Sequence, residues 1–164
     1  MVFLKRTYFL VILILFSAFA GCSAKTYTPV LQTQFDLNAV YKTGDFSYDA
    51  RIVRNEEGVF ITPLSSYAAG MTISCDGKTV TFTQGDFVKS FDKSSLDSTN
   101  PAILLYEVFS YLEALEKVNS YVKDEDFVIK GKTSIGTFTL IQSKNNKMKS
   151  LSIPDANIEI EFKY

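Results

Sequence analysis

The sequence predicts a mostly β domain of the α+β class, with one long amphipathic helix and a single antiparallel sheet. First, alternation of apolar and polar residues dominates from Phe35 onward, which indicates strands with one buried face. Second, helical periodicity follows Asn100-Pro101. Third, the strands are grouped before and after this helix rather than alternating with it, which favours antiparallel pairing. A sheet of about ten strands should curl into an incomplete β-barrel with the helix in its concave face.

Short turn sequences separate the expected strands. Gly44-Asp45, Asp76-Gly77 and Asn145-Asn146 contain residues that tolerate the positive φ of tight hairpin turns. The last strand alternates cleanly, with Ile158, Ile160, Phe162 and Tyr164 predicted to face inward. The expected strands cover 35–41, 46–53, 59–62, 71–75, 80–82, 127–130, 136–142, 148–153 and 157–164.

The predicted helix begins at Pro101 and continues to about Asn119. Asn100 supplies a capping side chain, and proline suits the first helical turn. Ile103 and Tyr106 fall among the polar residues of the helix, where they could form part of a binding-site mouth. The apolar stripe consists of Leu104, Leu105, Val108, Phe109, Tyr111, Leu112, Leu115 and Val118.

The amino-terminal segment has the three parts of an export signal. Lys5 and Arg6 precede an apolar run that is too short for a stable membrane-spanning helix, and small residues follow it. The order Phe19-Ala20-Gly21-Cys22 resembles the bacterial lipobox, which implies that residues 1–21 are a signal peptide and that Cys22 carries lipid. The protein is then expected to be membrane-anchored on the extracytoplasmic side of the cell envelope.

After the signal peptide, the sequence predicts two parts. Residues 22–33 form the lipidated amino terminus and a tether, and residues 34–164 form one domain. An alternative is a secreted protein in which Cys22 pairs with Cys75, the only other cysteine. If Cys22 carries lipid, a hydrophobic core must stabilise the domain without a disulfide.

Over residues 34–164 the chain resembles the fold family of the bacterial outer-membrane lipoprotein carrier and receptor (LolA/LolB-like). The resemblance rests on the alternating strands around Gly44, the loop 63–70 before "MTISCDGKTVTFTQGDF", the apolar helix after Pro101 and the closing strands. In that family an incomplete β-barrel is closed by helices around an apolar cavity. The resemblance therefore implies that this protein binds a lipid or a lipidated protein.

The composition argues against catalysis. The chain has no histidine, which removes the commonest general base and the histidine metal ligands. Its acidic residues are scattered, and there is no phosphate-binding glycine loop. We expect no enzyme activity, no catalytic residue, no metal and no cofactor; a facing carboxylate pair in a polar cleft would instead indicate a hydrolase. The net charge of −1, which falls to −3 without Lys5 and Arg6, favours no nucleic-acid partner.

Fourteen Phe and nine Tyr residues suggest a cavity lined by aromatic side chains. We expect it to hold a lipid, a lipoprotein or another apolar ligand. The alternative is an envelope interaction or sensor lipoprotein with a filled core, which would contact other envelope proteins. The cavity candidates are Phe46, Tyr48, Phe82, Leu104, Val108, Phe138 and Phe162. The mouth candidates are Tyr67, Met71, Ile103 and Tyr106.

Overall fold

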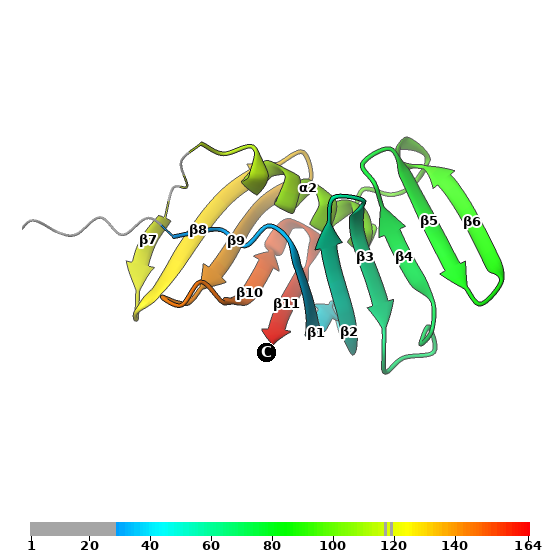
Figure 1. Ribbon diagram of the computed structural model, residues 1–164, viewed down its shortest axis with the longest axis horizontal. Coiled ribbons are helices and arrows are strands. Elements are labelled where there is room, and N and C mark those ends of the chain that lie inside the picture. The colour runs from blue at the N-terminus through cyan, green and yellow to red at the C-terminus, as the bar shows by residue number, and fades with distance from the viewer. Residues whose placement is uncertain (1–28, 117, 119) are drawn as a thin grey trace, which may run out of the picture.

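The computed structural model describes residues 29–116, 118 and 120–164. It contains one antiparallel sheet of 11 strands in the order β6-β5-β4-β3-β2-β1-β11-β10-β9-β8-β7. The sheet is open, and its two edge strands, β6 and β7, lie at opposite ends of the molecule (Figure 1). Within the described residues there is one α-helix, α2 (Pro101–Glu113).

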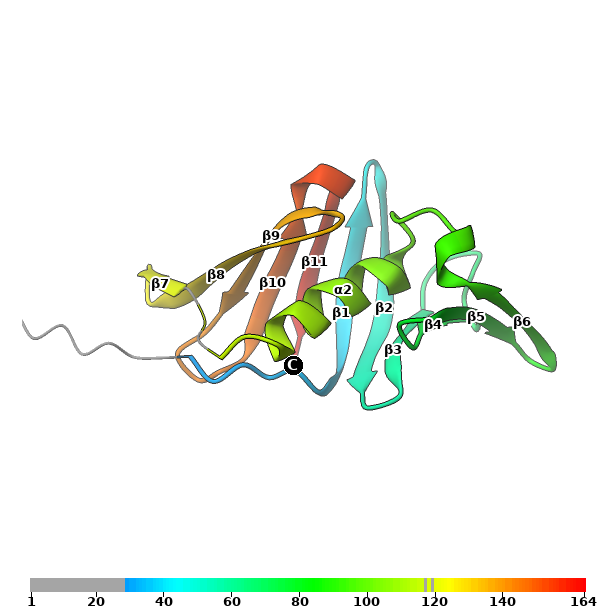
Figure 2. The same ribbon diagram turned by 90° about the horizontal axis from the view of Figure 1, so that it is seen from above.

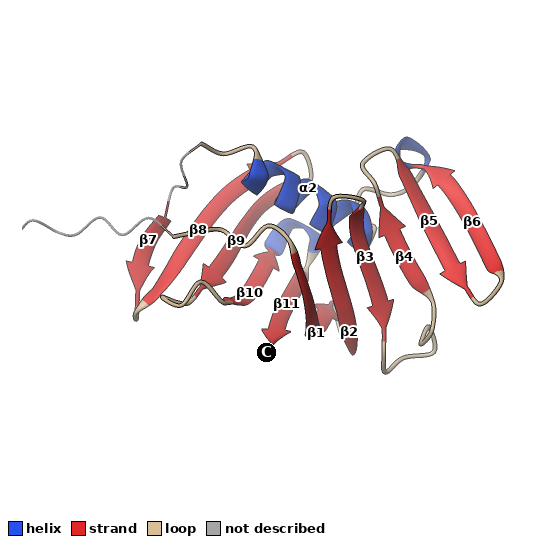
Figure 3. Cartoon of the chain, in the orientation of Figure 1, coloured by secondary structure: helices blue, strands red, loops and turns tan. Residues whose placement is uncertain are grey.

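Nearly every strand is paired with its neighbour in the sequence, as successive hairpins require (Figure 3). The exception joins β1 to β11, so the first and last strands meet in the middle of the sheet. The strands are β1 (Phe35–Thr43), β2 (Phe46–Asn55), β3 (Gly58–Pro63), β4 (Thr72–Cys75), β5 (Thr79–Gln84), β6 (Phe87–Asp92), β7 (Ser120–Lys123), β8 (Asp126–Thr133), β9 (Gly136–Gln142), β10 (Met148–Ile153) and β11 (Ile158–Lys163). Two short 3-10 helices are η1 (Lys93–Ser95) and η2 (Pro154–Ala156).

The predicted alternation of buried and exposed residues is confirmed in the central strands. Ala39 and Tyr41 of β1, and Ile160 and Phe162 of β11, are buried while their immediate neighbours are more exposed. Tyr164 departs from this pattern because it follows the last paired residue, and 58% of its surface is exposed. The positive φ of Gly44, Gly77 and Asn146 confirms the expected turn conformations.

Helix α2 crosses one face of the sheet (Figure 2). The Asn100 side chain accepts a hydrogen bond from the Ala102 amide at 3.0 Å, which confirms the predicted cap. Buried helix residues form one hydrophobic cluster with buried residues of the sheet. These helix residues are Ala102, Ile103, Leu104, Leu105, Val108, Phe109 and Leu112.

The helix ends at Glu113, earlier than the predicted end near Asn119. Strand β7, which was not expected from the sequence, begins at Ser120, just after the end predicted for the helix; Ser120 pairs with Ile129 of β8. Asp124 and Glu125 make the turn between the two strands with positive φ.

Candidate functional site

An open groove of about 580 Å³ lies beside the first turns of α2. It is bounded by the turn between β4 and β5, by η1 and the segment after it, and by the turn between β8 and β9. Three apolar side chains, Leu96, Ile103 and Ile135, contribute to its lining. The other lining residues are polar or glycine: Gly77, Lys78, Asp92, Lys93, Ser94, Ser98, Glu107 and Ser134.

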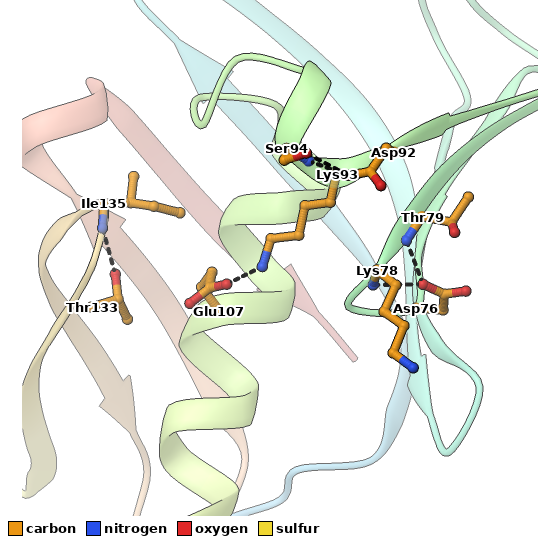
Figure 4. Close-up of polar contacts among 9 residues, drawn as sticks. All are labelled: Asp76, Lys78, Thr79, Asp92, Lys93, Ser94, Glu107, Thr133 and Ile135. Carbon is orange, nitrogen blue, oxygen red and sulfur yellow. Dashed lines mark hydrogen bonds and ion pairs between the residues drawn. The ribbon is translucent and has the colours of Figure 1, made fainter.

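Aspartate caps shape the wall formed by η1 and the β4–β5 turn. Asp92 accepts from the Ser94 amide at 2.9 Å, and Asp76 accepts from the amides of Lys78 and Thr79 at 2.8 and 2.7 Å (Figure 4). Hydrogen bonds from Ser94 lower the pKa of Asp92, and the two backbone amides lower that of Asp76. The Lys93 amide joins the two segments by donating to the Lys78 carbonyl at 2.7 Å.

An ion pair crosses the groove wall between η1 and the helix. Lys93 Nζ donates to Glu107 Oε1, and both side chains are about one-quarter exposed (Figure 4). The same Nζ lies 5.6 Å from the centroid of the Tyr106 ring. The pair places both signs of charge next to an apolar surface, which suits an amphipathic ligand.

Tyr106 packs against the β4–β5 turn beside the groove, but it does not line the groove itself. Its ring packs against Gly77, where an added Cβ would lie 2.4 Å from the tyrosine hydroxyl. Arg54 lies on the ring, with its Cζ 5.5 Å from the centroid. Arg54 Nη2 also donates to Glu113 Oε2 at 2.8 Å. Tyr106 is therefore held between Gly77 and Arg54 and does not project freely as a mouth residue.

The opposite wall is the β8–β9 turn, which carries Ile135. The Ile135 amide donates to Thr133 Oγ1 at 3.3 Å, and the side chain extends towards the helix (Figure 4). Asp155 supports the turn by accepting from the Thr137 amide at 2.7 Å. Gly136, with φ 142°, is required because an added Cβ would lie 2.3 Å from Asp155 Oδ2.

The predicted cavity residues do not line this groove. Leu104, Val108, Phe138 and Phe162 lie in the hydrophobic core. Tyr48 and Phe82 are partly buried at its margin. Phe46 departs from the expected convergence, since 76% of its surface is exposed at the first position after a tight turn.

Two predicted mouth residues also lie elsewhere. Tyr67 is fully exposed and Met71 is partly buried, and neither lines the groove. Ile103 does line it, although only 2% of its surface is exposed. Ile103 also belongs to the hydrophobic core cluster, so it is buried despite its place among the polar residues of the helix sequence.

Sequence reasoning missed Leu96, Ile135 and the pair formed by Lys93 and Glu107. Glu107 lies among the polar residues of the helix, and the other three lie in or beside short connections. Leu96 and Ile135 are isolated apolar residues in otherwise polar connections, which is the one sign of them in the sequence. This sign does not reveal that the segments around residues 96 and 135 meet at the helix.

Aromatic packing fills the interior beneath the helix. Phe35 and Phe109 meet edge to face with ring centroids 4.8 Å apart, and Tyr111 meets Phe138 at 5.6 Å. Gly131 permits the second contact, because an added Cβ would lie 2.4 Å from the Phe138 ring. The aromatic rings therefore pack against one another and do not surround an empty cavity.

Cys75 is a free, buried thiol in the core. Burial raises its pKa, which disfavours the reactive thiolate. Among the residues that the structure describes, no group of three or more His, Cys, Asp or Glu side chains could hold a metal ion.

The predicted signal peptide and the lipidation site Cys22 lie outside the described residues, as does most of the predicted tether 22–33. Within the described part of the chain, no helix is both long enough and apolar enough to cross a membrane. A scan against protein-family models finds no match to this chain, and a search of curated proteins also finds none.

Proposed function

We propose that this protein is an extracytoplasmic lipoprotein, anchored through lipid on Cys22, that binds an amphipathic ligand in the groove beside α2. The observation that carries the proposal is the lining: Leu96, Ile103 and Ile135 are placed next to the ion pair of Lys93 and Glu107. An apolar chain would contact the three apolar residues, while a polar end group would meet the charges and serines.

The size of the groove supports a small ligand or a single acyl chain. Its volume of about 580 Å³ falls within the roughly 300–1,000 Å³ common for ligand sites. The ligand is expected to lie in the groove rather than inside the sheet, because rings and aliphatic side chains fill the core. The role is binding, without chemical conversion of the ligand.

The arrangement of the sheet and the helix also supports the proposed binding function. We take the open sheet as an incomplete β-barrel whose concave face holds α2, since α2 contacts β3, β4 and β8. This arrangement resembles the lipoprotein carrier and receptor family, in which helices close an incomplete barrel. In this protein, however, the proposed ligand site lies beside the first turns of the helix rather than beneath it.

Ligand binding can be tested on residues 23–164, which contain every described strand and the whole core. Lysophosphatidylcholine is titrated by calorimetry against the wild type, Ile135→Glu and the control Phe46→Glu. Phe46 is exposed outside the groove. We expect Ile135→Glu to weaken binding at least tenfold and Phe46→Glu to leave it unchanged. Equal binding by all three folded proteins would contradict the groove as the site.

A Leu104 variant cannot serve as this test. Leu104 is 1% exposed in the core, so a charged side chain there would unfold the domain and remove binding for an unrelated reason.

A second candidate function is interaction with another envelope protein through β6. This edge strand pairs only with β5, and 61% of Phe87 and 62% of Val88 is exposed. An open edge with apolar side chains can accept an extended segment of a partner. Val88→Lys should abolish such an interaction in a pull-down from envelope extracts while preserving lysophosphatidylcholine binding.

A further inference from the structure

The chain enters the domain at a fixed point beside the β9–β10 turn. Gln142, whose side chain is completely buried, donates from Nε2 to the Val30 carbonyl at 2.8 Å and to the Asn146 carbonyl at 2.9 Å. One side chain therefore holds the entering segment against the turn. Leu31 also packs against the core. The direction from which the amino-terminal segment reaches the sheet is set by these contacts.

Exposed apolar and basic side chains gather at this end of the sheet. Val30, Asn146, Lys147 and Tyr164 line one depression of about 450 Å³. Lys147 Nζ lies 4.7 Å from the Tyr164 ring centroid. We call this end the entry face and define it by Val30, Tyr121, Val122, Lys123, Lys144, Lys147 and Tyr164; Tyr121 and Val122 are adjacent on β7, so their side chains lie on the two sides of this edge strand.

The β7–β8 hairpin belongs to the same face. Lys144 in the β9–β10 turn lies 3.3 Å from Glu125 in the β7–β8 turn. Tyr121 and Val122 of β7 are 48% and 59% exposed. Figure 1 shows that β7 and β6 are at opposite ends of the sheet. The exposed apolar residues of β7 are therefore far from those of β6.

The distance to the lipid restricts how the domain can lie. Cys22 and Pro29 are seven residues apart, and a fully extended chain of that length spans at most about 25 Å. Ten inter-strand spacings separate the two edges, or roughly 48 Å at the usual strand separation. If the lipid is on Cys22, the tether holds Pro29 within about 25 Å of the bilayer, whereas it places no such limit on the β6 edge.

We propose that the entry face rests on the surface of the lipid bilayer and holds the β6 edge away from it. This inference depends on the proposed lipid anchor. Tyrosine and lysine suit the water–lipid boundary, where the ring meets the acyl region and the ammonium group stays hydrated. The anchor keeps the local concentration of lipid high, so a surface with weak intrinsic affinity is sufficient.

The chain contains no tryptophan, so a single introduced tryptophan reports depth without background. The full chain is expressed with its signal, purified with its lipid and reconstituted in vesicles that contain brominated phosphatidylcholine and phosphatidylglycerol. Tyr121→Trp places the probe on the entry face, and the matched control Phe87→Trp places it on the β6 edge. Both positions are exposed.

We expect bromine to quench Tyr121→Trp at least threefold more than Phe87→Trp. Equal quenching, or stronger quenching of Phe87→Trp, would overturn the proposed orientation. Palmitate labelling of the wild type and Cys22→Ser is measured in parallel. Labelled, vesicle-bound protein without selective quenching would refute the orientation alone, whereas absent labelling would refute the anchor and the orientation together.

Discussion

Helix α2 has a filled side and an open side, and the sizes of the facing side chains explain the difference. Beneath the helix, the rings of Phe109 and Tyr111 meet those of Phe35 and Phe138. Beside its first turns, the surroundings include Gly77 and serines 94, 98 and 134, which are too small to fill the space. The same helix thus contributes to the core through one side and to a groove through the other.

The stability of the fold and the binding of a ligand should depend on different sides of the helix. Residues beneath the helix belong to the large hydrophobic core cluster, and their truncation should weaken the fold. Groove residues other than Ile103, which also belongs to the core, should tolerate changes better. Substitutions on the two sides should therefore affect different measurements.

The largest expected effect comes from truncation on the filled side. Leu104→Ala should lower the free energy of unfolding by about 2–5 kcal/mol, because it removes buried methyl groups and leaves a cavity. Urea denaturation measures the change, with Leu64→Ala as the control because Leu64 is 49% exposed. A loss below about 1 kcal/mol for Leu104→Ala would show that the interior is less tightly filled than described.

The hairpins and the buried faces of the central strands were predictable because they depend on local alternation and turn residues. The β1–β2 hairpin around Gly44 and the alternation of β11 follow directly from sequence. The short strand β7 was not predictable, since three of its four residues are exposed and it shows no alternation of buried and exposed positions. The groove was not predictable because Ile103 and Ile135 are brought together only by the tertiary fold.

A smaller loss is expected at the contact between the helix and β8. Gly131→Ala would introduce a Cβ 2.4 Å from the Phe138 ring and 2.7 Å from Tyr111. Overpacking of this kind costs about 1–3 kcal/mol. Thermal unfolding should show a lower melting temperature, and Ser134→Ala provides the comparison on the open side. Unchanged stability in Gly131→Ala would contradict the tight contact between these rings.

The ion pair between Lys93 and Glu107 should contribute less to the free energy of unfolding than the core contacts do. Both side chains are partly exposed, so Lys93→Gln should change the free energy of unfolding by about 0–1 kcal/mol. Its effect on lysophosphatidylcholine affinity should be larger than its effect on stability. A loss of stability comparable to that of Leu104→Ala would place the pair in the core rather than at the groove.

Acid should weaken the turns around the groove. The pKa values of Asp76, Asp92 and Asp155 are lowered by hydrogen bonds to the folded chain. Their stabilisation is therefore present above the unfolded pKa of about 3.9 and is lost as pH falls through the lower folded values. Melting temperature should change little between about pH 5 and 8 and decrease below about pH 4.

Asp76→Asn isolates one of these groups. Its amide oxygen can still accept from the Lys78 and Thr79 amides but carries no charge, so the decrease in melting temperature below about pH 4 should be smaller than in the wild type. An identical acid profile would show that the Asp76 carboxylate does not contribute to it.

The most direct test of the account is a two-dimensional amide NMR titration of residues 23–164 with lysophosphatidylcholine below its micelle concentration. We expect saturable shift changes concentrated at Leu96, Ile103 and Ile135, with small changes at the core residues Val108 and Phe162. Saturable changes centred on those core residues would place the ligand beneath the helix and contradict the groove as the binding site.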